Sequence, residues 1–519
     1  MNQIRKSTIP NNYDAIIIGS GIGGLVTASQ LSLKGLKVLV LESYKIPGGS
    51  GGSFERKGYK FDVGASMIFG FGKRGFTNLL TRAISDVGED CETVPDPVQL
   101  KYHLPKNLKI TVNRDYEKFI SQLSQIFPHE KKGINKFYGT CWKVFNCLDS
   151  MPLLSIEDPA YLAKVFFKSP LSCLGLARWL PVNAGDVAEK FIKDKNLLKF
   201  IDIECFCWSV MPAGSTPMIN AGMVFSDRHA GGINYPKGGV GVIAQKLVNG
   251  LKKYNGDIKY KSKVSKVIIE NNKAIGVEIS NGEKFYAKTI ISNATRWNTF
   301  GGEGVKEPLI DKEYTPKSEV NWSKKYLPSP SFLSLHLGIN ENIIPEDFEC
   351  HHLILNNWNE MDKEQGVIFI SIPSILDKDL APTGKHIVHA FTPSNFQNWD
   401  KLSNKDYLNK KKADANYLIS RIENIIPNLS TNIDHIEVGT PKSHRRFLGR
   451  HLGSYGPIPS RKLPGLLTMP FNTTDIENFY CVGDSCFPGQ GLNAVAFSGY
   501  ACAHKIGAKL GVNEWKLPD

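Results

Sequence analysis

The sequence contains few cysteines, ten among 519 residues. Such a low density excludes a disulfide scaffold and is typical of a chain that folds in a reducing compartment. Cys205 and Cys207 have C-x-C spacing, but no second pair follows that would complete a zinc site. We therefore predict buried, unpaired thiols and no metal ion.

Long hydrophobic runs are also missing. No stretch of about 18 uninterrupted apolar residues occurs, so the sequence predicts no transmembrane helix. The first residues, Met1 to Asn12, include two basic side chains and no apolar segment. We expect neither a secretory signal peptide nor an organelle transit peptide there.

The charge is unbalanced, with 63 basic against 50 acidic residues and a formal net charge of +13. Such an excess favours anionic partners, either phospholipid or nucleic acid. The basic residues are spread along the chain, and no zinc-finger, RNA-recognition or helix-turn-helix signature accompanies them. We predict a membrane surface as partner and no nucleic acid, with general lysine enrichment as the simpler alternative.

Glycine-rich segments near both ends carry the strongest functional signal. Gly19 to Gly24 reads G-x-G-x-x-G between two continuous apolar runs, Ala15–Ile18 and Val38–Leu41, with a helical pattern between them. Continuous apolar runs are typical of parallel strands covered on both faces. Glu42 ends the second run, 23 residues after Gly19. This βαβ pattern predicts a Rossmann-like dinucleotide site.

Each residue of that pattern has a physical role. Gly19 permits a tight turn, Gly21 lets the backbone approach a pyrophosphate, and Gly24 lets helix and strand pack closely. The helix start offers free N–H groups and a positive dipole end to the phosphates. Glu42 can accept hydrogen bonds from both ribose hydroxyls, which disfavours NADP.

The choice between NAD and FAD rests on two further segments. Pro47 to Ser53 has almost no side-chain volume, as a loop against an extended cofactor would, although a plain flexible loop explains it equally well. Gly483 and Asp484 follow a terminal strand and place a carboxylate within reach of a ribityl hydroxyl. A helix opening at Asn493 would aim its positive dipole end at a flavin ring. Together these segments favour FAD.

The remaining pattern indicates a second, mixed region. Val240–Leu251 reads as a helix, and Ile258–Ile269 and Ala274–Ile279 read as strands joined by an Asn-Asn turn. Asn281-Gly282 is a hairpin signal before the strand at 284–291. Further strands are expected at 332–337 and 367–372, whereas residues 91–230 mix helical stretches with aromatics and prolines.

These segments resemble the two-lobe FAD superfamily of amine oxidases, carotenoid desaturases and Rab GDP-dissociation inhibitors, and most of all the carotenoid isomerase family. The similar stretches are 61–72, 208–212, 220–229, 232–239, 444–450 and 487–499. The resemblance runs from about Tyr13 to Lys509. It implies an α/β fold in which a Rossmann-like FAD-binding lobe and an α+β substrate lobe are interleaved in sequence.

The resemblance also implies a ligand set and lobe boundaries. Ser50 stands where many superfamily members have an arginine, so no arginine contact to phosphate is expected there. The FAD-binding lobe is predicted at 1–75, 231–300 and 441–519, and the substrate and membrane-facing lobe at 76–230 and 301–440. The predicted cofactor-binding residues are Gly19, Gly21, Ile22, Gly23, Gly24, Glu42, Ser43, Gly48, Gly49, Ser50, Val264, Gly483, Asp484, Gly491, Leu492, Asn493 and Ala494.

Family membership implies conversion of poly-cis-lycopene to all-trans-lycopene with reduced FAD and no net redox change. One alternative is an FAD-dependent carotenoid or retinoid desaturase or saturase, which changes substrate mass by two hydrogens. Another is a flavin-free isoprenoid carrier of the GDP-dissociation-inhibitor type, against which the retained Asp484 argues. The sequence identifies no electron donor and no catalytic side chain.

An apolar polyene requires an apolar channel and access to lipid. The predicted lining residues are Trp208, Met211, Met218, Met223 and Phe225, with core packing an equally good explanation for each. The segments 161–168 and 171–180 are apolar with interspersed basic residues, which fits an in-plane membrane helix pair or helices packed on their own lobe. We expect a peripheral protein on the cytoplasmic side of a thylakoid or plasma membrane.

Overall fold

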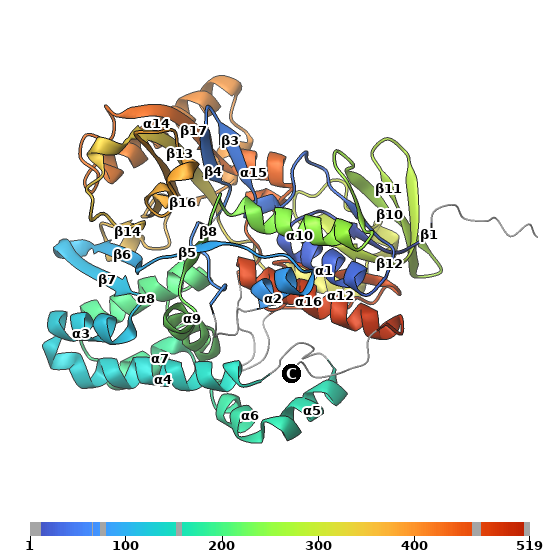
Figure 1. Ribbon diagram of the computed structural model, residues 1–519, viewed down its shortest axis with the longest axis horizontal. Coiled ribbons are helices and arrows are strands. Elements are labelled where there is room, and N and C mark those ends of the chain that lie inside the picture. Colours follow the sequence, from blue (N-terminus) through green and yellow to red (C-terminus); the bar gives the residue numbers. More distant parts are fainter. Residues whose placement is uncertain (1–11, 65, 73–78, 152–157, 459–468, 513–519) are drawn as a thin grey trace, which may run out of the picture.

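Two β-sheets organise the chain. The computed structural model describes residues 12–64, 66–72, 79–151, 158–458 and 469–512, so the leader up to residue 11 and parts of the predicted lobes lie outside the described residues. Figure 1 shows the first sheet on the right and the second at the upper left, with a layer of helices below the second sheet.

The first sheet confirms the predicted Rossmann-like fold. Its parallel part runs in the order β18, β12, β1, β2, β9, and an antiparallel ribbon of β10 and β11 continues from β12. The strands are β1 (Asn12–Ile18), β2 (Val38–Leu41), β9 (Asp257–Lys259), β10 (Val264–Glu270), β11 (Lys273–Ile279), β12 (Lys284–Ser292) and β18 (Phe479–Cys481).

Both faces of this sheet are covered, which explains the continuous apolar runs. Ile17 and Val40 pack into a core with the helices on one face, whereas Ile16 and Leu39 pack with the antiparallel ribbon on the other. The helices of the first core are α1 (Ile22–Leu33), α2 (Leu79–Asp86), α10 (Gly241–Lys253) and α16 (Leu492–Lys509). The predicted helices at 25–33, 240–251 and 493–497 are therefore confirmed.

The strand predicted at 258–269 is wrong as a single element. The chain leaves β9, which pairs with β2, and enters β10, which pairs with β11 on the other side of the sheet. Lys261 has a φ of 54° between the two strands, a left-handed conformation that breaks a regular strand. The Asn-Asn turn is confirmed, since Asn271 and Asn272 both have positive φ values.

The second sheet has the order β17, β13, β16, β15, β14, β6, β7 and is antiparallel except between β14 and β6. The predicted strands at 332–337 and 367–372 are confirmed as β13 and β15. The interpretation of 91–230 overlooked β6 and β7, although Leu100, Tyr102 and Leu104 alternate in the sequence and are buried. The strands are β6 (Val98–Leu104), β7 (Leu108–Asn113), β13 (Ser331–Asn340), β14 (His351–Leu355), β15 (Val367–Ser371), β16 (Lys385–Ser394) and β17 (Ile433–Gly439).

Helices cover parts of both faces of the second sheet. Helix α14 (Asn404–Ile422) packs on the face that carries Leu333 and Ile368. A helical layer packs against β6 and β14 through a core that includes Tyr102 and Leu353. That layer consists of α3 (Tyr116–Ile126), α4 (Lys131–Asp149), α7 (Ala184–Phe191), α8 (Lys195–Ser209) and α9 (Met218–Ala230).

Smaller elements complete the described chain. Two helices, α5 (Pro159–Lys168) and α6 (Pro170–Ala177), project at the lower edge in Figure 1. The others are α11 (Arg296–Phe300), α12 (Lys317–Lys325), α13 (Gln397–Asp400), α15 (Pro441–Leu448), β3 (Ser53–Arg56), β4 (Tyr59–Asp62), β5 (Thr93–Pro95) and β8 (Asn234–Pro236). Across the described ranges, no helix is both long and apolar enough to cross a membrane.

Candidate functional site

The first glycine loop connects β1 to α1. Gly19 has a φ of 92°, and a Cβ on Gly24 would lie 2.5 Å from the Gly19 carbonyl oxygen. Gly21 precedes the first helical residue, Ile22, and no side chain caps the helix. The first-turn N–H groups of α1 are thus available to an anion.

The second glycine segment lies against the first. The Gly48 amide donates to the Ser20 carbonyl at 2.8 Å, and Gly21 and Gly48 form a parallel bridge. Gly49 has a φ of 55°, which favours glycine, and a Cβ there would be in van der Waals contact with the Gly21 Cα at 3.6 Å. Ser50 follows directly in a short 3-10 turn at Gly49–Gly51.

Asn293 joins the first glycine loop to the last one. It follows β12, the strand that lies between β1 and β18. A Cβ on Gly21 would lie 2.6 Å from the Asn293 Nδ2, and a Cβ on Gly483 would lie 2.9 Å from its Oδ1. The structure therefore brings the early and late glycine segments together, as the sequence analysis expects. The analysis did not single out Asn293, because an asparagine after a strand belongs to no short motif.

Asp484 is less exposed than a free surface carboxylate. It forms an ion pair with Arg450, and both side chains are 14% exposed. The Arg450 guanidinium also lies 5.1 Å from the ring centroid of Tyr455. Arg450 was quoted in a family-like stretch but not predicted as a site residue, because only tertiary folding brings it to Asp484.

The Glu42 carboxylate accepts hydrogen bonds from neighbouring backbone and side-chain groups. Its Oε2 accepts from the Ser20 amide at 2.8 Å and from the Ser20 hydroxyl at 2.6 Å. Its Oε1 accepts from the Ser43 hydroxyl at 3.1 Å and the Tyr44 amide at 2.7 Å. Both hydroxyls can rotate, so the carboxylate keeps room for ribose donors. Val264 is nearby at the start of β10, two residues after Ser262, whose amide donates to the Glu42 carbonyl at 2.8 Å.

The start of α16 lies against the second glycine segment. Gly491 precedes the helix with a φ of 109°, and a Cβ on Gly51 would lie 2.8 Å from the Leu492 side chain. The Asn493 Nδ2 donates to the Phe69 carbonyl at 2.9 Å. Within the described ranges, the buried Asn493 Oδ1 and Gln490 Nε2 have no hydrogen-bond partner. Ala494 follows in the first turn, where the free N–H groups lie.

These features fit a flavin nucleotide. The glycine cradle leaves no room for side chains, the two helix starts offer N–H groups, and unpartnered amide atoms remain at α16. The residues that would hold the cofactor are those predicted from the sequence, together with Asn293 and Arg450.

The predicted lining residues fall into two groups. Trp208 has a partly exposed side chain, and its ring lies 4.9 Å from Phe69, whose carbonyl Asn493 binds. Met223 is also partly exposed and packs on the helical core. Met218 and Phe225 are fully buried in that core and Met211 is nearly so, which argues against a channel wall at these positions.

A row of aromatic side chains on the second sheet was missed. Phe369 stacks on Phe391 with ring centroids 4.9 Å apart. The ring centroids of Phe391 and Phe332 are 5.1 Å apart, and those of Phe332 and Tyr455 are 5.2 Å apart. All four side chains are partly exposed. The row ends at Tyr455, which lies under Arg450 and hence beside Asp484. The sequence signal was weak because each aromatic comes from a different strand or loop.

Glu204 lies near Trp208 in sequence, but its side chain is buried in the helical layer and has partners there. It is fully buried, pairs with Arg228 at 2.5 Å and accepts from the Tyr138 hydroxyl at 2.6 Å. Both carboxylate oxygens of Glu204 therefore have a partner within the helical layer, and removal of either partner would leave a buried group unpaired.

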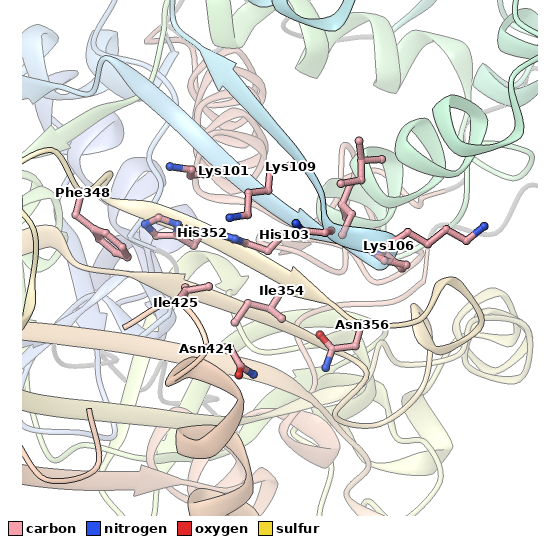
Figure 2. Close-up of a pocket in the computed structure, with 14 residues that line it drawn as sticks. Lys101, His103, Lys106, Lys109, Phe348, His352, Ile354, Asn356, Asn424 and Ile425 are labelled. Carbon is pink, nitrogen blue, oxygen red and sulfur yellow. Dashed lines mark hydrogen bonds between the residues drawn. The ribbon is translucent and has the colours of Figure 1, made fainter. Parts of the chain in front are cut away.

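A pocket of about 570 Å³ opens elsewhere, beside β6, β7 and β14 (Figure 2). Basic and apolar side chains both line it, among them Lys101, Lys106, His103 and Ile354. The His103 Nε2 lies 3.1 Å from the His352 Nδ1. The pocket includes none of the predicted site residues.

Comparison with known proteins decides the family. The sequence profile of the flavin containing amine oxidoreductases matches residues 22–506. The chloroplastic prolycopene isomerase of Daucus carota is 54% identical over 504 residues, which cover 97% of this chain and 81% of the relative. The chain belongs to the prolycopene isomerase family. A second member, chloroplastic prolycopene isomerase 2 of an Oncidium hybrid cultivar, is 55% identical over 98% of this chain and 85% of its own length.

More distant proteins share the architecture. A lycopene-forming phytoene desaturase of Pseudescherichia vulneris is 23% identical over 94% of this chain and 98% of its own length. The crystal structure of an oxidoreductase from Methanosarcina mazei has a TM-score of 0.62 at 19% identity, covering 94% of this chain and 99% of that one. Membership in the prolycopene isomerase family makes the chain an enzyme with a flavin cofactor, and the two-lobe flavoprotein fold is confirmed.

Proposed function

We propose that this chain isomerises poly-cis-lycopene to all-trans-lycopene with FAD in its reduced form and without net redox change. The observation that carries the proposal is 54% identity to a prolycopene isomerase across nearly the whole chain. The desaturase relative is much less similar, at 23% identity. A flavin-free carrier would have no use for the glycine cradle and the carboxylate of Asp484.

The residue types of the site support FAD in particular. The first-turn N–H groups of α1 would bind the pyrophosphate, and Glu42 the adenosine ribose. Asp484 follows Gly483 and pairs with Arg450, and these two residues would bind the ribityl chain and the ring edge. When bound, reduced flavin supplies an electron or a proton that temporarily lowers the order of a polyene double bond.

The chain's own residues would position the polyene. The aromatic row of Phe369, Phe391, Phe332 and Tyr455 forms an apolar wall that leads toward Asp484. Trp208 and Phe69 lie at the start of α16 and would form the facing side. Aromatic faces exclude water and hold a conjugated chain without any polar contact. We propose these positions as the substrate channel, with Met223 at its edge.

We also propose that α5 and α6 dock on a membrane surface. Phe167 and Leu171 are 81% and 84% exposed, and the exposed Lys164, Lys168 and Arg178 lie on the same two helices or directly after them. An apolar surface bordered by basic residues suits the interface of an anionic bilayer, where the substrate dissolves. A thylakoid or plasma membrane would be approached from its cytoplasmic side.

The decisive experiment is an anaerobic incubation of poly-cis-lycopene with enzyme whose FAD is either oxidised or reduced. Chromatography and mass spectrometry of the product separate the candidates. The proposal predicts all-trans-lycopene of unchanged mass with reduced enzyme alone. A mass change of two hydrogens would establish a desaturase or saturase, and a colourless, flavin-free preparation that binds lycopene would establish a carrier.

A further inference from the structure

Three side chains that can bind a metal meet outside the flavin site. Asp96 follows β5, and its amide donates to the Ile233 carbonyl at 3.0 Å. Cys350 and His351 lie where β14 begins. One ligand atom from each of these three residues lies within 4.8 Å of the others. Asp96, Cys350 and His351 expose only 1%, 2% and 0% of their surface.

Two of these atoms point at each other without a hydrogen bond. The Asp96 Oδ2 and the His351 Nε2 are 3.5 Å apart, and within the described ranges neither has a hydrogen-bond partner. The other carboxylate oxygen and the other ring nitrogen each have a hydrogen-bond partner. The Asp96 Oδ1 accepts from the Val98 amide at 3.0 Å, and the His351 Nδ1 contacts the Ser371 hydroxyl at 2.8 Å. Donation from Nδ1 to Ser371 leaves a lone pair on Nε2 directed into the cluster.

The spacing suits a tetrahedral metal ion. Metal–ligand bonds of about 2.0–2.3 Å place neighbouring ligands roughly 3.3–3.8 Å apart. The distance between the Asp96 Oδ2 and the His351 Nε2, 3.5 Å, already has this value, and the Cys350 sulfur lies within 4.8 Å of both atoms. One carboxylate oxygen, one imidazole nitrogen and one thiolate form a donor set that Zn²⁺ accepts.

The cation beside the cluster has other partners. Arg114 donates to the Ile233 and Gly231 carbonyls and to the Asn234 Oδ1. If Asp96 and Cys350 bind as a carboxylate and a thiolate, a divalent cation would balance their charge.

We propose that Asp96, Cys350 and His351 form a buried zinc site that ties the segment after β5 to the second sheet. Water would take the fourth position, which the three side chains leave open. The site shares no residue with the flavin cradle. It does not depend on the proposed isomerase activity.

The test measures metal and flavin in the same holoenzyme. The full chain is produced with added zinc, freed of loosely bound metal, and analysed by elemental mass spectrometry. We expect about one zinc per chain in the parent, with loss of most of it in Cys350→Ser and His351→Gln. Cys141→Ser, which alters a buried thiol of α4, is the matched control and should keep both zinc and flavin.

Growth with cobalt gives an independent readout. Cobalt bound to a thiolate has visible bands at longer wavelengths than flavin absorption, and we expect these bands in the parent but not in Cys350→Ser. The parent protein decides the proposal even if the variants fail to fold. Less than about a tenth of an equivalent of zinc in flavin-loaded parent protein would overturn it. Unchanged zinc in all folded variants would overturn it as well.

Discussion

At the scale of single residues, the cofactor site depends on glycines at positions where a larger side chain would not fit. Gly21, Gly23 and Gly483 surround the Asn293 amide so closely that a Cβ on any of them would lie within 3.1 Å of it. Gly24 is more restricted, because its neighbour is the backbone oxygen of Gly19 at 2.5 Å. An amide side chain can move away, whereas the backbone carbonyl of Gly19, which directly follows β1, cannot.

Gly24→Ala should therefore reduce flavin binding severely. The added methyl group forces the α1 start away from β1, at a cost of about 1–3 kcal/mol in unfolding free energy. Gly139→Ala is the matched control, since nothing lies within 4 Å of that position on α4. There the alanine should stabilise the helix by up to about 1 kcal/mol. Flavin-to-protein absorbance ratios and urea unfolding measure both effects, and equal flavin content would contradict this account.

Asp484→Asn should also lower flavin occupancy. Without the carboxylate, Arg450 is left largely buried beside Tyr455 without its partner, which costs about 3 kcal/mol. Glu477→Gln breaks an exposed ion pair with Lys273 and should change stability by less than about 1 kcal/mol. Thermal unfolding and flavin content of both variants provide the measurement. Full flavin occupancy in Asp484→Asn would remove this residue from the site.

At the scale of elements, short-range patterns predicted most of the cofactor lobe. Apolar runs and glycines alone predict β1, α1 and β2. The two asparagines, Asn271 and Asn272, predict the turn that they form. The break between β9 and β10 was not predictable, because Lys261 carries no turn signal and both halves look like one strand. Phe225 and Met218 were assigned to a channel, whereas α9 buries them among other helices.

The helices α5 and α6 yield an element-scale prediction. Leu174→Glu and Leu408→Glu alter leucines that are both 61% exposed, the first on α6 and the second on α14. Only the α6 change should weaken binding to anionic vesicles, by about tenfold or more, because only that leucine would enter the lipid. Vesicle flotation measures binding. Equal flotation of the two variants, or none for the parent protein, would refute membrane docking by this helix pair.

At the scale of the whole molecule, the two sheets depend on segments that are distant in sequence. The strands β6 and β7 precede β13 by more than two hundred residues and still complete the second sheet. Sequence patterns predict neither that pairing nor the meeting of Phe369, Phe391, Phe332 and Tyr455. The resemblance to a family predicted the interleaved lobes, but the lobe boundaries stay a prediction.

Buried histidines give the molecule a predictable pH dependence. Burial lowers the pKa of His336 to about 4 and of His444 to about 3, and that of His389 also falls well below its usual value. The His336 and His389 ring centroids are 4.5 Å apart, positive charge on His336 or Arg450 lowers the pKa of His444 further, and charge on His336 or His444 lowers that of His389.

In the unfolded chain these histidines are protonated as the pH falls through about 6.5, whereas in the folded chain they stay neutral. The free energy of unfolding is therefore highest above that pH and decreases below it. Each histidine should lower it by about 1.3 kcal/mol between about pH 7.5 and 5.5. Urea unfolding at the two pH values measures the loss, and His336→Gln should make it smaller. A stability that rises on acidification would contradict the buried, neutral state.

The close packing of α16 on α1 has a consequence for biosynthesis. A Cβ on Gly499 would lie 2.3 Å from the Gly23 carbonyl oxygen, so the last helix is part of the wall around the first loop. A nascent polypeptide that has not yet emerged from the ribosome as far as this helix has only half of the nucleotide cradle. Flavin capture must therefore follow translation of α16, and until then the hydrogen-bond donors of the first loop stay exposed to water.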